Sequence, residues 1–183
     1  AVGCTMVIKP AQETPLSALA MAELAHRAGV PPGVLNIVPG TDARAIGGEL
    51  TGNPLVKKLS FTGSTPVGKV LMQQCATTVK RTSMELGGNA PVIVFADADI
   101  KQAVAGAAAS KYRNAGQTCI CANRILVQDA VYDDFVEQFC ELVASYRVGD
   151  GLDPDSTHGP LVNSAAVDSV DALVQEAIQQ GAT

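Results

Sequence analysis

Short apolar runs alternate with amphipathic segments along the first half of the chain, and this alternation constrains the fold more than any other feature. It predicts strands at residues 3–9, 34–38, 56–61 and 81–86, and helices at residues 16–29, 43–51 and 66–77. Because a helix between two strands crosses back over the sheet, consecutive strands in this pattern run parallel. We therefore expect an α/β fold with a parallel sheet in which the first strand is buried.

The pattern restarts after the pair Gly87-Gly88. Asp97 or Asp99 can cap the first helix of this second half. The predicted elements are strands at 91–95 and 124–128, helices at 100–113, 132–146 and 163–180, and a loop rich in Gly, Asp and Pro at 149–160. The glycine pair between the two series predicts a domain boundary near Gly88, with domains at residues 1–88 and 89–183.

Composition excludes several classes of partner. The net charge is −5 and no block of Lys or Arg is present, so we expect neither nucleic acid nor an anionic membrane surface as a partner. No apolar run approaches the roughly 20 residues of a membrane span. Five irregularly spaced cysteines indicate a reducing compartment, and we expect the cytoplasm, with the mitochondrial matrix as the alternative.

Two motifs carry the chemistry. Cys119 ends the sequence Gly-Gln-Thr-Cys at residues 116–119, a turn that can present a thiol to a ligand. Glu85 lies between Met84 and Leu86 and just before two glycines, with few charges nearby. A thiolate that attacks an electrophilic carbon and a carboxylate that later activates water are the groups that covalent catalysis needs. Taken alone, Glu85 could also be an ordinary surface acid at a strand end.

The sequence Gly63-Ser64-Thr65 falls between a predicted strand and a helix that begins with Pro66. Backbone N–H groups and the helix dipole at such a helix N-terminus favour a bound phosphate. The motif is not G-x-G-x-x-G, so an ordinary strand-to-helix turn is the competing interpretation. Lys9 follows a predicted strand, where open α/β sheets bind ligands, although a lysine there can equally be a solvated charge.

The remaining cysteines and histidines suggest no metal centre. Cys119 and Cys121 could be two buried apolar cysteines or half of a metal site, but a second ligand pair is lacking and His26 and His158 lie in unrelated segments. We therefore predict no metal. Three further cysteines are predicted to belong to the apolar core, and His26 to the surface; these cysteines are Cys4, Cys75 and Cys140.

Three motifs together resemble the aldehyde dehydrogenase superfamily: residues 61–68 (FTGSTPVG), residues 84–89 (MELGGN) and the turn that ends at Cys119. The resemblance implies an incomplete aldehyde dehydrogenase fold. Residues 1–88 are then the C-terminal part of a Rossmann-like NAD(P)-binding domain, and residues 89–183 the N-terminal part of a catalytic domain. It covers essentially the whole chain but well under half of the family's usual length, so we expect an internal fragment.

The resemblance also implies residue roles. Cys119 is the expected nucleophile and Glu85 the general base, whose pKa partial desolvation would raise. Lys9 is expected to bind the adenosine ribose of NAD or NADP. Gln12 stands where many NAD-using members carry an acid, so both cofactors remain open. The other expected cofactor-binding residues are Thr62 near the nicotinamide, Gly63 and Ser64 at the phosphates, Gly68 and Leu86.

Arg113 narrows the expected substrate. A helix-end Arg can simply offset the helix dipole, but the surrounding stretch resembles the succinate-semialdehyde dehydrogenase branch, in which this Arg binds a distal carboxylate through its planar guanidinium. Cys121 becomes a candidate redox partner of Cys119 in a disulfide. We expect oxidation of succinate semialdehyde to succinate by a homo-oligomer. The alternatives are an aldehyde dehydrogenase of broader specificity, or a non-catalytic binding or structural domain.

Overall fold

The computed structural model describes residues 3–183, and its chain divides into two compact units between Leu86 and Gly87. The division falls beside the glycine pair at which the sequence pattern restarts. The assignment of the two halves to a cofactor-binding and a catalytic domain stays a prediction.

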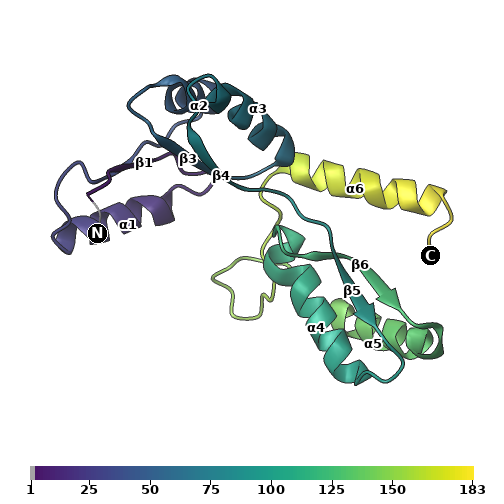
Figure 1. Cartoon of the computed structure of the whole chain (residues 1–183). Helices are drawn as coiled ribbons and strands as arrows, with labels where there is room; N and C mark the ends of the chain where they lie inside the picture. Colours follow the sequence, from purple (N-terminus) through teal and green to yellow (C-terminus); the bar gives the residue numbers. More distant parts are fainter. Residues whose placement is uncertain (1–2) are drawn as a thin grey trace. The chain divides into compact units, whose positions relative to one another are not determined.

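The first unit contains the seven elements predicted for it, each within a few residues. The strands β1 and β2 form one parallel pair, and β3 and β4 form another, in register from Lys58↔Arg81 to Thr62↔Glu85. The helices α2 and α3 lie side by side, and α3 packs against the second pair (Figure 1). The bounds are β1 Met6–Ile8, α1 Leu16–Arg27, β2 Leu35–Ile37, α2 Ala43–Gly52, β3 Lys58–Thr62, α3 Thr65–Ala76 and β4 Arg81–Glu85.

Local chemistry explains where these helices begin and end. Gly29 adopts a φ of 83°, a left-handed conformation that glycine tolerates, just past the end of α1. The Asp42 carboxylate accepts a hydrogen bond from the Ala45 N–H at 2.9 Å and caps α2. Pro66 lies in the first turn of α3, where its missing N–H has no partner to lose.

Two expectations for this unit are wrong in the described chain. Met6 and Val7 of β1 are 56% and 47% exposed, so the strand is not buried. Within residues 3–183 β1 pairs with β2 alone, and the pairs β1–β2 and β3–β4 do not join into one sheet. A parallel strand is buried when neighbours flank both edges and helices cover both faces, and the described residues supply β1 with only part of that cover.

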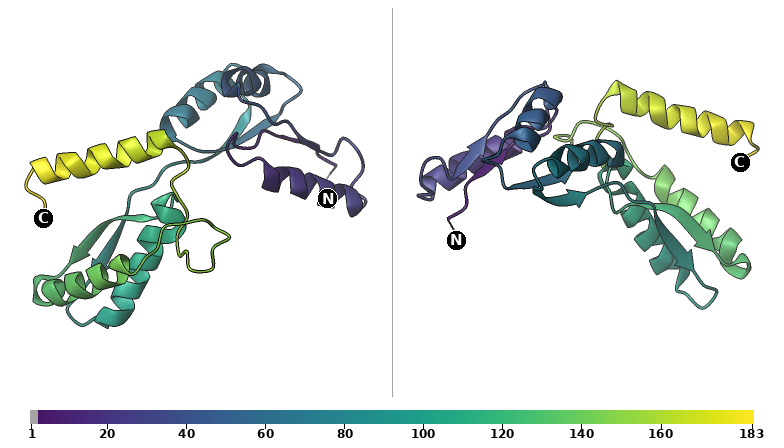
Figure 2. Two further views of the ribbon diagram at one scale, coloured as in Figure 1. Left: turned by 180° about the vertical axis from the view of Figure 1, so that it is seen from behind. Right: turned by 45° about the horizontal axis from the view of Figure 1, so that its top comes forward.

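The second unit has a core of its own. The strands β5 and β6 run parallel, and α4 and α5 lie side by side over one face of them (Figure 2). Val94, Val104, Ala107 and Phe135 are buried between the sheet and the helices. The bounds are β5 Ala90–Val94, α4 Ile100–Tyr112, the 3₁₀ turn η1 Arg113–Gly116, β6 Ala122–Val127, the 3₁₀ turn η2 Asp129–Val131, α5 Tyr132–Ala144 and α6 Ser164–Gln179.

An aspartate caps α4, as predicted. Of the two candidates the cap is Asp99, because its carboxylate accepts a hydrogen bond from the Gln102 N–H at 3.1 Å. Asn163 caps α6 in the same way, with the Ala166 N–H at 2.9 Å. None of the helices in residues 3–183 combines the length and apolar character needed to cross a membrane.

The cysteine predictions divide. Cys75 is buried as expected, whereas Cys4 and Cys140 are exposed and do not belong to the core. Apolar neighbours in sequence misled the prediction here, because Cys4 precedes the exposed strand β1 and Cys140 occupies an outward-facing position of α5. His26 is exposed on α1, as predicted.

Candidate active site

The turn between β3 and α3 (residues 62–65, called the β3–α3 turn) brings several predicted site residues together. Thr62 ends β3 directly opposite Glu85 of β4, and the Gly63 N–H donates to the Glu85 carbonyl at 3.0 Å. Ser64 precedes the helix in an extended conformation, and its hydroxyl makes no capping hydrogen bond with the helix. An exposed hydroxyl and the N-terminal N–H groups of a 12-residue helix are therefore available to an anion.

Two glycines make this arrangement tight. A Cβ on Gly63 would lie 2.5 Å from Cζ of Phe61, so the turn folds directly over that ring. A Cβ on Gly68 would lie 2.5 Å from Cδ2 of Leu86, so the first turns of α3 pack against the residue that follows β4. Gly63, Gly68 and Leu86 thus hold the helix N-terminus beside the end of β4.

Glu85 itself differs from expectation. The sequence predicted partial desolvation of its carboxylate, but the residue is exposed in the described chain. Its neighbours Met84 and Leu86 are half-buried. Because successive strand residues point to opposite faces, the apolar flanks occupy the covered face and leave Glu85 on the open one. Apolar neighbours in sequence therefore did not translate into an apolar surrounding.

Lys9 follows a strand pair that, within residues 3–183, is not hydrogen-bonded to the strands flanking the β3–α3 turn. It follows β1 and is half-buried, and its Nζ donates to the Pro10 carbonyl at 2.9 Å. The pair β1–β2 shares no strand hydrogen bond with β3–β4 among the described residues. Gln12 is exposed and donates through Nε2 to Oε1 of Glu13 at 2.9 Å. A ribose-binding role of Lys9 stays a prediction.

The segment from Arg113 to Cys121, called the Cys119 loop, turns sharply after α4. Asn114, Ala115 and Gly116 adopt φ values of 52°, 54° and 80°. A left-handed conformation costs a residue with a Cβ roughly 1–2 kcal/mol, so the loop needs stabilising contacts. Two of them are internal: the Gln117 N–H donates to the Asn114 carbonyl at 3.1 Å, and the Thr118 hydroxyl donates to the Arg113 carbonyl at 3.3 Å.

Cys119 is exposed in this loop, two residues before its end, and its backbone lies against Gly88. A Cβ on Gly88 would overlap the Cys119 carbonyl oxygen. Asn123 holds Gly88 in place by donating to its carbonyl at 3.2 Å, and Lys111 donates to the Asn123 side chain at 3.0 Å. Sequence reasoning did not assign Gly88 to the site. The Gly-Gly pair was its only signal, and that pair was used for the domain boundary.

Cys121 is buried, and its Sγ lies 4.0 Å from the Arg113 carbonyl oxygen, in contact with the same loop. Both Cys119 and Cys121 are free thiols. A disulfide between them, and hence a redox role of Cys121, stays a prediction. Burial raises the pKa of the Cys75 thiol above its ordinary value, with Lys80 opposing the shift. This makes Cys75 a poor thiolate source compared with an exposed cysteine.

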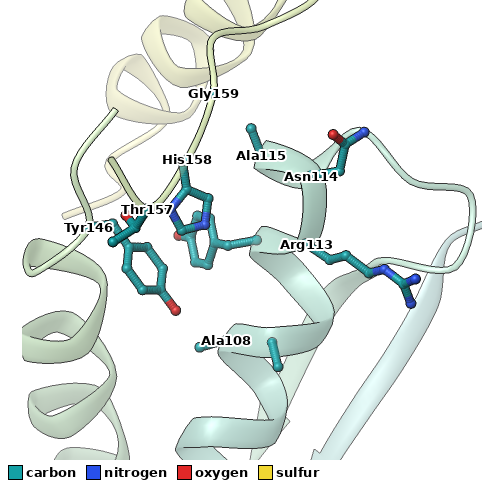
Figure 3. A pocket seen from close by; sticks show the side chains of 10 residues that line it. Ala108, Arg113, Asn114, Ala115, Tyr146, Thr157, His158 and Gly159 are labelled. Atoms are coloured by element: carbon teal, nitrogen blue, oxygen red, sulfur yellow. Dashed lines mark hydrogen bonds between the residues drawn. The ribbon is translucent and has the colours of Figure 1, made fainter. Parts of the chain in front are cut away.

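Arg113 is exposed at the end of α4. The ion pairs of the described residues do not include it, so its guanidinium is available to an anion. A pocket of about 310 Å³ lies on this end of the helix, lined by Tyr112, Tyr146 and His158 among others. Figure 3 shows the Arg113 side chain directed away from Tyr146 and His158, so the guanidinium is not part of that aromatic wall.

The aromatic side chains of this wall contact one another. The ring centroids of Tyr146 and His158 are 4.3 Å apart, and Nδ1 of His158 lies 2.9 Å from the Thr157 hydroxyl. Burial, and to a lesser degree Tyr146 and Cys140, raises the pKa of the Tyr112 hydroxyl. These residues pack the loop between α5 and α6 against the end of α4.

The chemistry available is thus distributed over the two units. The first contains an open helix N-terminus with Glu85 beside it, and the second contains an exposed thiol and an unpaired guanidinium on one loop. An exposed thiol and a carboxylate are groups that covalent catalysis uses, and a helix N-terminus can bind an anion.

Comparison with known proteins shows the family to which a chain with these groups belongs. Residues 1–183 match the model of the aldehyde dehydrogenase family. A succinate-semialdehyde dehydrogenase [NADP(+)] of Escherichia coli (strain K12) is 60% identical over 182 residues, which are 100% of this chain and 38% of that protein. A glutarate-semialdehyde dehydrogenase of Pseudomonas putida is 59% identical, again over 100% of this chain and 38% of its own length.

Solved structures give the same result for the fold. The crystal structure of succinate-semialdehyde dehydrogenase from Burkholderia pseudomallei has a TM-score of 0.96 at 56% sequence identity, and the match covers 99% of this chain and 37% of that one. The predicted α/β class and its incomplete extent are therefore confirmed. The chain spans just over a third of the length of the relatives it matches, and it belongs to the aldehyde dehydrogenase family.

Proposed function

We propose that this chain carries the nucleophile, general base and cofactor-binding turn of an enzyme that oxidises an aldehyde to a carboxylic acid with NAD or NADP. The observation that carries the proposal is the presentation of Cys119. Cys119 is exposed in a loop of defined geometry and ends the Gly-Gln-Thr-Cys motif, whereas Cys75 and Cys121 are buried and the exposed Cys4 and Cys140 lie outside that loop. Exposure is what a cysteine needs in order to attack a substrate.

The proposed chemistry begins with addition of the Cys119 thiolate to the aldehyde carbon, which forms a C–S bond and places a negative charge on the former carbonyl oxygen. The Cys119 backbone N–H stabilises that oxyanion. Loss of hydride from the same carbon leaves a thioester on Cys119. Glu85 takes a proton from water, the hydroxide attacks the thioester, and the acid leaves as the thiolate is regenerated.

The β3–α3 turn supports the cofactor assignment. The Ser64 hydroxyl makes no capping bond and Ser64 is exposed at the N-terminus of α3, so a pyrophosphate can approach the backbone there. The nicotinamide cofactor supplies the hydride acceptor. We propose Thr62, Gly63, Ser64, Gly68, Leu86 and Lys9 as the residues that hold it. The neutral side chain of Gln12 is compatible with NADP, the cofactor in the name of the Escherichia coli relative.

For the substrate we propose an aldehyde with a distal carboxylate, succinate semialdehyde first and its one-carbon-longer homologue glutarate semialdehyde second. Support comes from the unpaired Arg113 guanidinium, six residues before Cys119 on the same loop. The two relatives are named for these two substrates. A guanidinium binds a carboxylate with two parallel hydrogen bonds, which discriminates against uncharged aldehydes.

The chemical steps are tested by two substitutions in the full-length protein. Cys119→Ala removes the atom that forms the thioester and is expected to abolish aldehyde oxidation. Glu85→Gln should preserve a burst of reduced cofactor while turnover falls by on the order of 10²-fold or more. The measurement is stopped-flow absorbance of the reduced cofactor. Normal oxidation by Cys119→Ala would contradict the covalent mechanism and favour a non-catalytic role for this chain.

The substrate is tested by Arg113→Ala, assayed on succinate semialdehyde and on propanal. Loss of a charge-assisted hydrogen bond costs about 1.5–3 kcal/mol, or roughly 10- to 150-fold in kcat/KM for the charged substrate. Propanal should change little, and Arg113→Lys should recover only part of the loss. Arg124→Ala is the matched control, because Arg124 bonds the Asn89 carbonyl at 3.2 Å and not a substrate. Equal losses on both aldehydes would mean that Arg113 only supports the Cys119 loop, and the proposed substrate class would then be no narrower than an aldehyde.

A further inference from the structure

The side chain of Gln117 joins two segments that are far apart in sequence. Its Nε2 donates to the Asn114 carbonyl at 3.1 Å, and its Oε1 accepts from the Val162 N–H at 2.8 Å. Asn114 belongs to the Cys119 loop, whereas Val162 belongs to the segment that leads into α6. Among the hydrogen bonds of residues 3–183, the second of these is the one that connects the loop to that segment.

The Cys119 loop needs such a connection. Asn114, Ala115 and Gly116 are all left-handed, and Asn114 and Ala115 pay a steric cost because each carries a Cβ. The Asn114 amide reinforces the turn by donating to the Gln117 carbonyl at 3.3 Å. Gln117 lies two residues before Cys119. It is therefore hydrogen-bonded to Asn114 within the turn, and its side-chain oxygen anchors the turn to Val162.

We propose that Gln117 is a positioning residue, whose amide fixes the Cys119 loop to the segment before α6 and so sets where the thiol meets a bound aldehyde. This inference rests on the proposed function only in taking Cys119 as the nucleophile. Both ends of the amide are needed, the oxygen for Val162 and the nitrogen for Asn114. The residue touches neither substrate nor cofactor in this assignment, and acts through the loop.

Three variants of the full-length protein separate the parts of this role. Gln117→Met has a similar length and makes neither hydrogen bond. Gln117→Glu retains an acceptor for the Val162 N–H and cannot donate to the Asn114 carbonyl when ionised. Asn163→Ala is the control. Asn163 directly follows Val162 and caps α6, so the substitution removes the cap and leaves both hydrogen bonds of the Gln117 side chain intact.

The experiment compares two reactions of the same thiol. One is single-turnover formation of reduced cofactor from succinate semialdehyde, which requires correct placement of the thiol. The other is alkylation of Cys119 by iodoacetamide, followed by peptide mass spectrometry, which requires only an exposed thiol. For Gln117→Met we expect the single-turnover rate to fall by on the order of 10-fold or more, with the alkylation rate of Cys119 and the cofactor KM unchanged. Gln117→Glu should fall in between, and Asn163→Ala should match the wild type in both reactions.

The competing explanation is that the substitution unfolds the region, and the alkylation rates of the buried Cys75 and Cys121 test it. If Gln117→Met unfolds the region, these thiols become alkylated as fast as Cys119, and the residue is merely structural. A single-turnover rate equal to wild type in Gln117→Met also overturns the proposal. Failure of the proposed function is distinguishable, because it shows as aldehyde oxidation by Cys119→Ala, whatever Gln117 does.

Discussion

The β3–α3 turn and the Cys119 loop both connect a strand with a helix at a predicted functional site, but different contacts determine their shapes. The β3–α3 turn is defined mainly by the neighbouring residues Phe61, Gly63 and Pro66, and one longer-range hydrogen bond, from the Gly63 N–H to the Glu85 carbonyl, closes it. The Cys119 loop depends on Gly88 and Val162, which are tens of residues away. A short turn with local contacts can be inferred from residue types, whereas a loop held by distant partners cannot.

Conformation reinforces the contrast. The β3–α3 turn uses ordinary backbone angles, with Ser64 at φ −72° and ψ 145°. The Cys119 loop contains two left-handed residues with a Cβ, Asn114 and Ala115. Hydrogen bonds of roughly 0.5–1.5 kcal/mol each have to offset that cost. We therefore expect remote substitutions to disturb the Cys119 loop more than the turn.

The largest expected effect breaks the remote contact at Gly88. Gly88→Ala places a Cβ against the Cys119 carbonyl, a backbone atom that cannot rotate away. The loop has to shift, and a displacement near 1 Å is expected to lower kcat by on the order of 10²-fold. Steady-state kinetics of the full-length protein measures it.

Gly106→Ala in α4 is the matched control, because a Cβ there meets nothing within 4 Å. It should leave kcat unchanged and stabilise the helix by about 0.5–1 kcal/mol. Wild-type kcat in Gly88→Ala would show that the Cys119 loop adapts as freely as the β3–α3 turn, and the contrast between them would be lost.

An intermediate effect is expected where α3 meets Leu86. A Cβ on Gly68 would crowd the Leu86 side chain, which can move at a cost, and overpacking of this kind typically destabilises by about 1–3 kcal/mol. Chemical denaturation of Gly68→Ala, compared with Gly48→Ala in the open part of α2, measures the difference in free energy of unfolding. Leu86→Ala combined with Gly68→Ala should recover part of the loss, and no recovery would assign the cost to another contact.

The smallest effect sharpens the role of the β3–α3 turn. Ser64 makes no capping bond, so Ser64→Ala should leave stability unchanged and raise the cofactor KM by roughly fivefold, equivalent to about 1 kcal/mol. Asp42→Ala should leave the cofactor KM unchanged and lower the stability by about 1 kcal/mol, because Asp42 caps α2. Thermal unfolding and cofactor titration are measured on both. A stability loss in Ser64→Ala with unchanged cofactor KM would make Ser64 a helix cap only.

Most of the helices and strands could be predicted from the sequence, whereas the burial of several residues could not. The helices α1 to α6 appear where periodicity and caps placed them, because backbone preference and capping act over a few residues. Burial was misjudged at β1, Cys4, Cys140 and Glu85, since apolar neighbours in sequence do not say which face another segment covers. The 3₁₀ turn η1 was also missed, although Asn114 and Gly116 are residue types that tolerate a left-handed backbone.

The sequence by itself determined the order of the elements, the parallel pairing of the strands and the motifs that assign the chain to its family. These features depend on the period of apolar residues and on residue types at fixed spacing. Only the tertiary structure decided that Gly88 lies against the backbone of Cys119 and that Gln117 bonds to Val162. Such contacts form between segments 31 and 45 residues apart. They arise from the packing of the whole unit, and although a glycine pair can mark a close approach, no local pattern says which distant segment packs there.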